Sequence, residues 1–199
     1  MGVIRAFIAI SISPEILHRL QGVTQQLKDR LEDVPVRWVP VENMHLTLKF
    51  LGDVSEANVE RIKEILEKVG RNCSPFEISV GELGAFPSLR RPRVIWAGVK
   101  APPELKALQR SIDTETARLG YAREEREFSP HLTLGRASRN ATPADSHRIG
   151  EVLASVKVGF LGVTRVDAVN LYRSDLRPQG SVYTCLASTV FQRNEKEQL

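Results

Sequence analysis

The stretch that decides the fold is a tetrapeptide that occurs twice, as His45-Leu46-Thr47-Leu48 and, 86 positions later, as His131-Leu132-Thr133-Leu134. A lone His-x-Thr has no diagnostic value, but this chain has only four histidines and still repeats the whole pattern. In an extended strand, side chains at i and i+2 share one face, and those at i+1 and i+3 share the other. Each copy is therefore predicted to be a strand that presents a histidine and a threonine on its polar face and two leucines to the core.

Similar segments follow both tetrapeptides. A helix beginning at Ser55 follows the first copy, and a helix beginning at Thr142 follows the second copy at a similar distance. A strand-like run comes after each helix, Phe76 to Val80 in the first case and the region 158–169 in the second. We interpret the chain as two structurally related halves, joined near residues 84–93 without an autonomous linker.

Helices are predicted where apolar residues recur with helical spacing after a start signal, such as the N-cap, proline and early acid of Ser13-Pro14-Glu15. Strands outnumber helices by about two to one, which excludes the single alternation of a doubly wound parallel sheet and predicts an α+β fold with largely antiparallel sheets. The predicted helices begin at Ser13, Ser55, Pro102 and Thr142, and the predicted strands are residues 3–10, 36–39, 45–51, 76–80, 94–99, 131–134, 166–172 and 182–190.

The composition is that of one globular domain. The 199 residues are 42% hydrophobic and 26% charged, which excludes a disordered or fibrous chain and leaves enough apolar material for a large core. We expect residues 1–199 to form a single domain of two lobes. A formal net charge of +4 favours anionic partners, because a positive field raises the local concentration of phosphates.

The cysteines and the N-terminus indicate where the protein works. Cys73 and Cys185 lie far apart without a metal or disulfide spacing, which excludes a zinc knuckle and a disulfide framework. The apolar stretch from Val3 to Ile12 is interrupted by Arg5 and lacks the basic start and cleavage site of a signal peptide. We therefore expect a cytoplasmic monomer without membrane attachment.

Two opposed imidazoles suit a reaction that needs a base and an acid in one step. If the halves are related by an approximate two-fold axis, the face with His45 and Thr47 meets the face with His131 and Thr133 across one cleft. In the hydrolysis of a cyclic phosphodiester, one group removes a proton from the attacking water and the other protonates the departing sugar oxygen. Histidine suits both tasks, because its unperturbed pKa lets both protonation states coexist near neutrality. The threonine hydroxyls can donate to the non-bridging oxygens as charge develops.

The same residues have plainer interpretations. A single strand histidine is more often a packing or surface group than a catalyst, and the repeat is what reverses that preference. His18 and His147 lie in predicted helices without a following threonine, so we interpret them as surface or packing residues. Two matched histidines without a nearby cysteine or paired carboxylates do not make a metal-ligand pattern. We therefore expect neither a metal nor another cofactor.

Further motifs accompany the tetrapeptides: Arg5-Ala6-Phe7-Ile8-Ala9-Ile10 at the start, Pro92-Arg93-Val94-Ile95-Trp96-Ala97-Gly98-Val99 in the middle, and Phe128-Ser129-Pro130 before the second copy. Together they resemble the two-histidine (2H) phosphoesterases. Within that superfamily the chain is most similar to the RNA 2′,3′-cyclic phosphodiesterases, also called 2′-5′ RNA ligases. The resemblance runs from about Ile4 to about Val190.

This resemblance implies a bilobal α+β structure in which two antiparallel sheets flank a central cleft and helices lie outside. It implies the opening of RNA 2′,3′-cyclic phosphate ends to 2′-phosphomonoesters and, in some members, the joining of tRNA halves through a 2′-5′ linkage without ATP. His45 matches the proton donor to the leaving 3′ oxygen, and His131 matches the base that activates water. Thr47 and Thr133 match the phosphate-binding threonines.

Three further residues are candidates for substrate contact. The family tends to carry a basic residue five positions after the second histidine, which is Arg136 here. Strict alternation turns Arg136 away from His131, but Gly135 can permit a bulge that turns it back. Arg5 and Phe7 share a face of the first strand and are candidates for phosphate contact and base stacking; the alternative places Phe7 in the core and Arg5 at an edge.

The motifs describe the phosphate and leave the rest of the ligand open. The expected partners are RNA ends or nucleotides with a 2′,3′-cyclic phosphate. Both motifs fit equally well a phosphodiesterase for another cyclic phosphate, such as an ADP-ribose cyclic phosphate or a cyclic nucleotide. A nucleotide or RNA binding module without turnover is a third interpretation. Its expected sign is a damaged motif, and here both motifs are intact.

Overall fold

The computed structural model describes residues 2–178 and 180–192 of the chain. Its helices are α1 (Pro14–Arg30), α2 (Glu56–Arg71), α3 (Pro103–Ala117) and α4 (Pro143–Ser155), with a 3-10 turn η1 (Val41–Asn43). Its strands are β1 (Val3–Ile10), β2 (Val36–Trp38), β3 (Leu46–Ser55), β4 (Phe76–Phe86), β5 (Val94–Lys100), β6 (His131–Ala137), β7 (Phe160–Val166), β8 (Ala168–Arg177) and β9 (Gly180–Val190).

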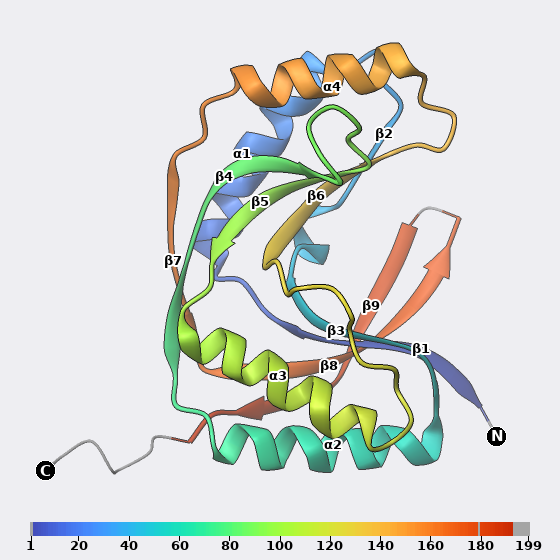
Figure 1. Ribbon diagram of the computed structural model, residues 1–199, viewed down its shortest axis with the longest axis vertical. Coiled ribbons are helices and arrows are strands. Elements are labelled where there is room, and N and C mark those ends of the chain that lie inside the picture. The colour runs from blue at the N-terminus through green and yellow to red at the C-terminus, as the bar shows by residue number, and fades with distance from the viewer. Residues whose placement is uncertain (1, 179, 193–199) are drawn as a thin grey trace, which may run out of the picture.

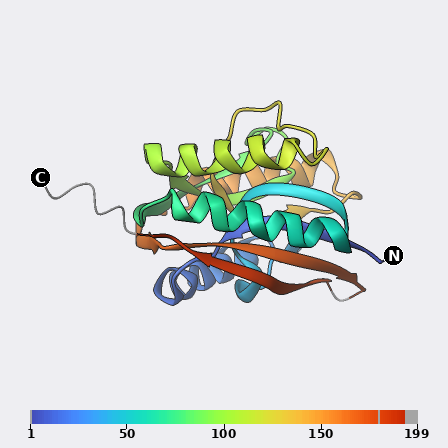
Figure 2. The same ribbon diagram turned by 90° about the horizontal axis from the view of Figure 1, so that it is seen from below.

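The strands form one antiparallel sheet, in the order β7-β4-β5-β6-β3-β1-β8-β9, with β2 paired to β6. The sheet divides at its middle into a His45 half (β3, β1, β8, β9) and a His131 half (β6, β5, β4, β7, β2). Helices α2 and α3 pack together on the His45 half, while α1 and α4 pack together on the His131 half, so the two helix pairs lie at opposite ends of the molecule (Figure 1). From the α2–α3 end, α2 is seen to lie beside the β8–β9 hairpin (Figure 2). The predicted α+β class with antiparallel strands is confirmed.

The starts of the helices agree with their sequence signals. Ser55 caps α2, since its hydroxyl accepts a hydrogen bond from the backbone N–H of Asn58. Thr142 and Asp145 form a reciprocal capping box at the start of α4. Pro14 occupies the first turn of α1, where its missing N–H costs nothing.

The observed arrangement of the strands and halves differs from the one predicted from the sequence in three respects. The two expected sheets are halves of one continuous sheet. The predicted strand 166–172 is split between β7 and β8, and the stretch from Phe160 onward forms an additional edge strand. The halves are also not consecutive in sequence, because the segment 84–93 lies within the β4–β5 hairpin of the His131 half and the chain passes between the halves several times.

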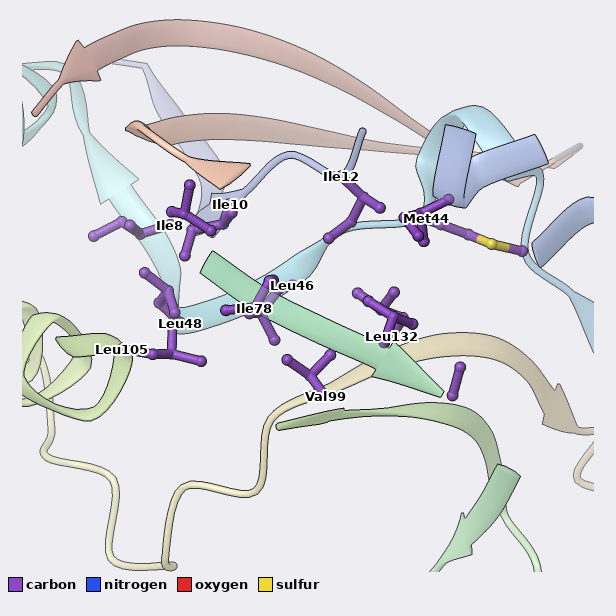
Figure 3. Close-up of a cluster of buried hydrophobic side chains, with 14 of the residues drawn as sticks. Ile8, Ile10, Ile12, Met44, Leu46, Leu48, Ile78, Val99, Leu105 and Leu132 are labelled. Carbon is purple, nitrogen blue, oxygen red and sulfur yellow. The ribbon is translucent and has the colours of Figure 1, made fainter. Parts of the chain in front are cut away.

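Leucines of the two tetrapeptides join the halves. In the described part of the chain, the register of β3 against β6 consists of the single pair Leu46 and Leu132. Both leucines are fully buried, as is Ile8, and they lie in one apolar cluster with Val99 and Leu105 (Figure 3). The apolar faces of both motifs therefore meet in one core beneath the sheet.

A buried ion pair fixes the segment that leads into β6. Lys49 of β3 is only 6% exposed, and its Nζ donates to Asp113 Oδ1 of α3 and to the backbone oxygen of Ala122, each at 2.5 Å. The same Asp113 oxygen accepts from the N–H of Glu124 at 3.1 Å. The connection between α3 and β6 is thus held against the strand that carries the first motif.

Candidate active site

The pairing of Leu46 with Leu132 determines which polar residues face one another. Residues directly opposite in an antiparallel pair share a face of the sheet. If this register continued by one position in each direction, His45 would lie across from Thr133 and Thr47 across from His131. All four side chains are half-buried, on the face opposite the buried leucines. We call this the motif face; it brings the four predicted residues together.

Each histidine is oriented by a backbone carbonyl two residues before it. His45 Nδ1 lies 2.7 Å from the oxygen of Asn43, and His131 Nδ1 lies 2.8 Å from the oxygen of Ser129. A carbonyl oxygen can only accept, so each Nδ1 carries the hydrogen in these contacts. Each Nε2 is then left to exchange a proton with a ligand. The amide of Asn43 also donates to the oxygen of Ser181 at 2.9 Å, which ties this support to β9.

Aromatic rings enclose His45. Phe7 stacks on the imidazole with ring centroids 4.7 Å apart, and Tyr172 stacks with both rings, at 5.3 Å from Phe7 and 6.3 Å from His45. Tyr183 packs edge-on against both His45 and Phe7. Phe7 is only 3% exposed, so its ring is covered by these neighbours. This burial argues against the predicted stacking of Phe7 on a base and assigns it to the support of His45.

In the described part of the chain, His131 has fewer aromatic neighbours than His45. Phe86 packs edge-on against its imidazole at 4.9 Å, and Trp96 lies 5.2 Å from Phe86. In the register of β5 and β6, Trp96 lies opposite Thr133 and Gly98 lies opposite His131. The motif face therefore continues from β6 across β5.

Burial lowers the pKa of both histidines. For His45, desolvation outweighs the hydrogen bond to Asn43, which acts in the opposite direction. For His131, desolvation again dominates over the hydrogen bond to Ser129, and the positive charge of Arg136 lowers the pKa further. A cation therefore acts on His131, whereas none is among the causes of the shift at His45.

A bulge turns Arg136 toward the motif face. The register of β5 against β6 passes from Ile95 opposite Gly135 to Trp96 opposite Thr133, so Leu134 is the extra residue. Leu134 and Gly135 are both buried, and Arg136 is exposed. The bulge lies next to Gly135, where the sequence had allowed one. The field of Arg136 at His131 agrees with this direction.

The remaining predicted residues are less constrained. Arg5 is exposed in β1, on the face of Phe7 and opposite Asp53. Within residues 2–178 and 180–192, the hydroxyls of Thr47 and Thr133 make no hydrogen bond that would compete with a ligand. The structure also adds groups that the sequence had not indicated: the carbonyls of Asn43 and Ser129, and the rings of Tyr172, Tyr183 and Phe86.

Neither a metal cluster nor a membrane span is found among the described residues. No group of three or more histidine, cysteine or acidic side chains in residues 2–178 and 180–192 is placed to hold a metal ion. In the same part of the chain, no helix has the length and apolar character needed to cross a bilayer.

The geometry matches a known family. The LigT like Phosphoesterase family matches residues 10–96 and 99–183, which include both tetrapeptides. The chain belongs to this family. The RNA 2′,3′-cyclic phosphodiesterase of Methanothermobacter thermautotrophicus is 38% identical over 181 residues, covering 91% of this chain and 95% of the relative. The protein of the same name from Archaeoglobus fulgidus is 33% identical and covers 90% and 96%.

Two solved structures share the fold over nearly the whole chain. TT0787 of Thermus thermophilus superposes with a TM-score of 0.78 at 25% identity, covering 94% of this chain and 97% of that one. E. coli LigT complexed with 3′-AMP superposes with a TM-score of 0.76 at 26% identity, covering 96% of this chain and all of that one. The LigT-like fold therefore extends over both halves of the sheet.

Proposed function

We propose that this LigT-like phosphoesterase hydrolyses RNA 2′,3′-cyclic phosphate ends to 2′-phosphomonoesters by acid and base catalysis without a metal. The observation that carries the proposal is the pairing of Leu46 with Leu132, which joins the two motifs and supports their action at one site. The names of relatives that cover nine tenths of the chain support the choice of RNA as substrate.

The proposed chemistry uses the Nε2 atom of each histidine, because each Nδ1 is held by a backbone carbonyl. His131 Nε2 takes a proton from water as the water oxygen attacks phosphorus, the bond from phosphorus to the 3′ oxygen breaks, and that oxygen takes a proton from His45 Nε2. Thr47 and Thr133 donate to the non-bridging oxygens as charge develops. Phe7 and the two carbonyls hold the imidazoles in place, which reduces the reorganisation needed for reaction.

Arg136 supports the division of roles between the histidines. A base must be neutral before the reaction, and the positive charge of Arg136 favours the neutral form of His131. An acid must be protonated, and no cation acts on His45 in this way. We therefore assign His131 as base and His45 as acid, with Arg136 also available to the phosphate. Arg5 is retained as a more distant phosphate contact.

Two other functions remain as outcomes of one experiment. A phosphodiesterase for another cyclic phosphate would use the same motifs, and a binding module would use them without turnover. Purified protein is incubated in EDTA with a short RNA ending in 2′,3′-cyclic phosphate, with an ADP-ribose cyclic phosphate and with a 3′,5′-cyclic nucleotide, and the products are assigned by phosphorus NMR. A 2′-phosphate from the RNA alone is the expected result. Turnover that needs a divalent ion would overturn metal-free catalysis.

The biological setting is part of the proposal. With an RNA 5′-hydroxyl in place of water, the same pair would form a 2′-5′ linkage, as in the joining of tRNA halves. We also propose that residues 1–199 form one bilobal domain, in which the two His-x-Thr-x (HxTx) tetrapeptides act as a single site. We further propose that the protein is a cytoplasmic monomer.

A further inference from the structure

A cavity lies beside His131 on the motif face. It has a volume of about 330 Å³ and lies over β4 and β5. Neither histidine lines it, but Ser129 and Pro130, which directly precede His131, form part of its wall. In the order of the sheet, β5 and β4 lie beyond β6, on the side away from β3. The cavity is therefore separated from His45 by His131.

The floor of this cavity is a row of residues across four strands. His131 lies opposite Gly98, Gly98 opposite Gly81, and Gly81 opposite Phe160. Two glycines thus separate the catalytic imidazole from a phenylalanine ring that is 71% exposed. Three strand spacings, about 14 Å, therefore separate His131 from Phe160.

The absence of side chains from this floor is built into the packing. A Cβ on Gly81 would lie 2.7 Å from the oxygen of Gly159, and a Cβ on Gly98 would lie 3.0 Å from the oxygen of Gly81. In the neighbouring row, the Trp96 indole lies over Gly84, where a Cβ would meet the ring at 2.2 Å. Backbone atoms therefore form the cavity wall between Trp96 and Phe160, and these two rings suit contact with a nucleobase.

The rim of the cavity is polar. Lys100 and Ser79 lie opposite each other on the motif face, and Glu82 occupies the bulge of β4. A lysine ammonium suits a phosphate of an RNA backbone, and a carboxylate or hydroxyl suits the hydroxyls of a ribose. The lining thus matches a nucleoside within an RNA strand better than a purely apolar ligand.

We propose that this cavity is the acceptor subsite of the 2′-5′ joining reaction and binds the nucleoside whose 5′-hydroxyl replaces water as the attacking group. The inference rests on the proposed function. Attacking and leaving oxygens lie roughly in line at phosphorus. With His45 on the side of the leaving oxygen, the attacking group comes from the side of His131, where the cavity lies.

The transfer step balances without ATP. The 5′ oxygen attacks phosphorus while His131 Nε2 takes its proton, and the bond from phosphorus to the 3′ oxygen breaks as His45 Nε2 delivers a proton to that oxygen. One phosphoester bond is formed and one is broken. The products are a 2′-5′ phosphodiester and a free 3′-hydroxyl, and proton exchange with water restores the two histidines.

The test compares two acceptor alcohols with one donor. Cytidine 2′,3′-cyclic phosphate is incubated with the protein and either adenosine or glycerol at equal concentration, and hydrolysis and transfer products are separated by chromatography. Glycerol offers a primary hydroxyl without a base. Because stacking of a base on aromatic rings changes binding by about tenfold or more, transfer to adenosine is expected to exceed transfer to glycerol by at least that factor.

Two variants locate the acceptor. A Cβ on Gly159 meets nothing within 4 Å, so Gly159→Leu adds bulk beside the cavity without a clash, and Phe160→Ala removes one ring. Each should lower transfer to adenosine by about tenfold and leave hydrolysis within about threefold. Gly22→Leu is the matched control, because Gly22 also has open space but lies on α1, outside the cavity lining.

Each other outcome has a distinct meaning. Equal transfer to adenosine and glycerol, with hydrolysis intact, would overturn the acceptor site and leave the proposed function standing. A rise in the KM of hydrolysis that matches the loss of transfer in both variants would place the donor's own nucleoside in the cavity and also overturn the inference. A wild-type protein without hydrolysis would instead remove the proposed function itself.

Discussion

At the scale of residues, the two histidines are alike in their support and different in their electrostatics. Both Nδ1 atoms are fixed by the carbonyl two residues before the ring, which leaves both Nε2 atoms for the ligand. Only His131 has its pKa lowered by a neighbouring cation, Arg136. This difference supports the proposed roles of His131 as base and His45 as acid.

Removal of either imidazole should stop turnover without loss of the fold. His45→Ala and His131→Ala are each expected to lower kcat by about 10² to 10⁴, because each removes one proton transfer from the rate-limiting step. The double variant should lower kcat by a factor far smaller than the product of the two single effects, since the two residues function as a unit. Steady-state kinetics with circular dichroism tests this, with exposed His18→Ala as control. Near wild-type turnover in either single variant would refute the assignment.

The pH dependence should report the lowered pKa values. One imidazole must be neutral and the other protonated, so kcat/KM is expected to follow a bell whose centre lies below the ordinary histidine pKa of 6.5. Arg136→Gln removes a charge that lowers the pKa of His131, and the centre should therefore move to higher pH. Exposed Arg139→Gln serves as the control that leaves it in place. An unchanged profile in Arg136→Gln would show that this charge does not tune the pair.

The threonines should matter less than the histidines. Thr47→Val and Thr133→Val keep the shape of each side chain and remove only a hydroxyl that can donate to the phosphate. Each is expected to lower kcat by roughly 10-fold to 10³-fold, the usual range for loss of one donor to a developing charge. Kinetics of the two variants beside wild type measures this, and a loss as large as that of the histidine variants would give the hydroxyls a part in proton transfer.

The repeated tetrapeptide was sufficient to predict the four residues that meet on the motif face, because strand alternation is a local property. It could not predict which backbone atoms hold the imidazoles. Asn43 and Ser129 act through their carbonyls, which every residue has. The rings around His45 come from β1, β8 and β9, and their neighbourhood depends on pairings far apart in sequence.

At the scale of elements, the structure depends on irregularities that propensity does not reveal. The register shifts of β3 against β1 place both Leu48 and Lys49 in the interior. The edge strand β7 could not be predicted in full because a glycine interrupts it and because Phe160 and Val163 are exposed. The helices were easier to predict, since Ser55 and Thr142 cap them with their own side chains.

Lys49 allows a test of the buried ion pair. Lys49→Met is expected to cost about 3–5 kcal/mol of unfolding free energy, because it leaves Asp113 largely buried without its cation. Lys63→Met, which breaks an exposed pair with Glu60, should cost less than about 1 kcal/mol. Urea unfolding at neutral pH measures both. Equal costs would show that burial does not strengthen the Lys49 pair.

The protonation of Asp113 determines the pH range over which Lys49→Met and wild type differ in unfolding free energy. Burial raises the pKa of this carboxyl, but the hydrogen bonds from Lys49 and the Glu124 N–H, with the charges of Lys49 and Arg123, lower it on balance. A carboxyl with a lowered pKa stabilises the fold above its unfolded pKa and loses that contribution as pH falls through the folded one. The difference in unfolding free energy between wild type and Lys49→Met should therefore disappear only at acidic pH.

At the scale of the whole molecule, the pair of Leu46 and Leu132 joins the two halves of the sheet. Each half supplies one histidine, one threonine and two helices, yet the chain crosses between the halves repeatedly. These crossings could not be predicted from the repeat, because they depend on which strands pair at long range. The site therefore belongs to neither half alone.

Truncation of either central leucine tests whether catalysis depends on this junction. Leu46→Ala and Leu132→Ala should each cost about 2–5 kcal/mol of unfolding free energy, since both side chains are fully buried. Leu176→Ala, at a position 65% exposed, should change it by less than about 0.5 kcal/mol. Under conditions where the variants remain folded, kcat should still fall by up to about 10², because small misplacement of reacting groups is costly. Urea unfolding and kinetics on the same samples separate the two effects. Reduced stability with full kcat would mean that the motifs are aligned by contacts other than the leucine pair.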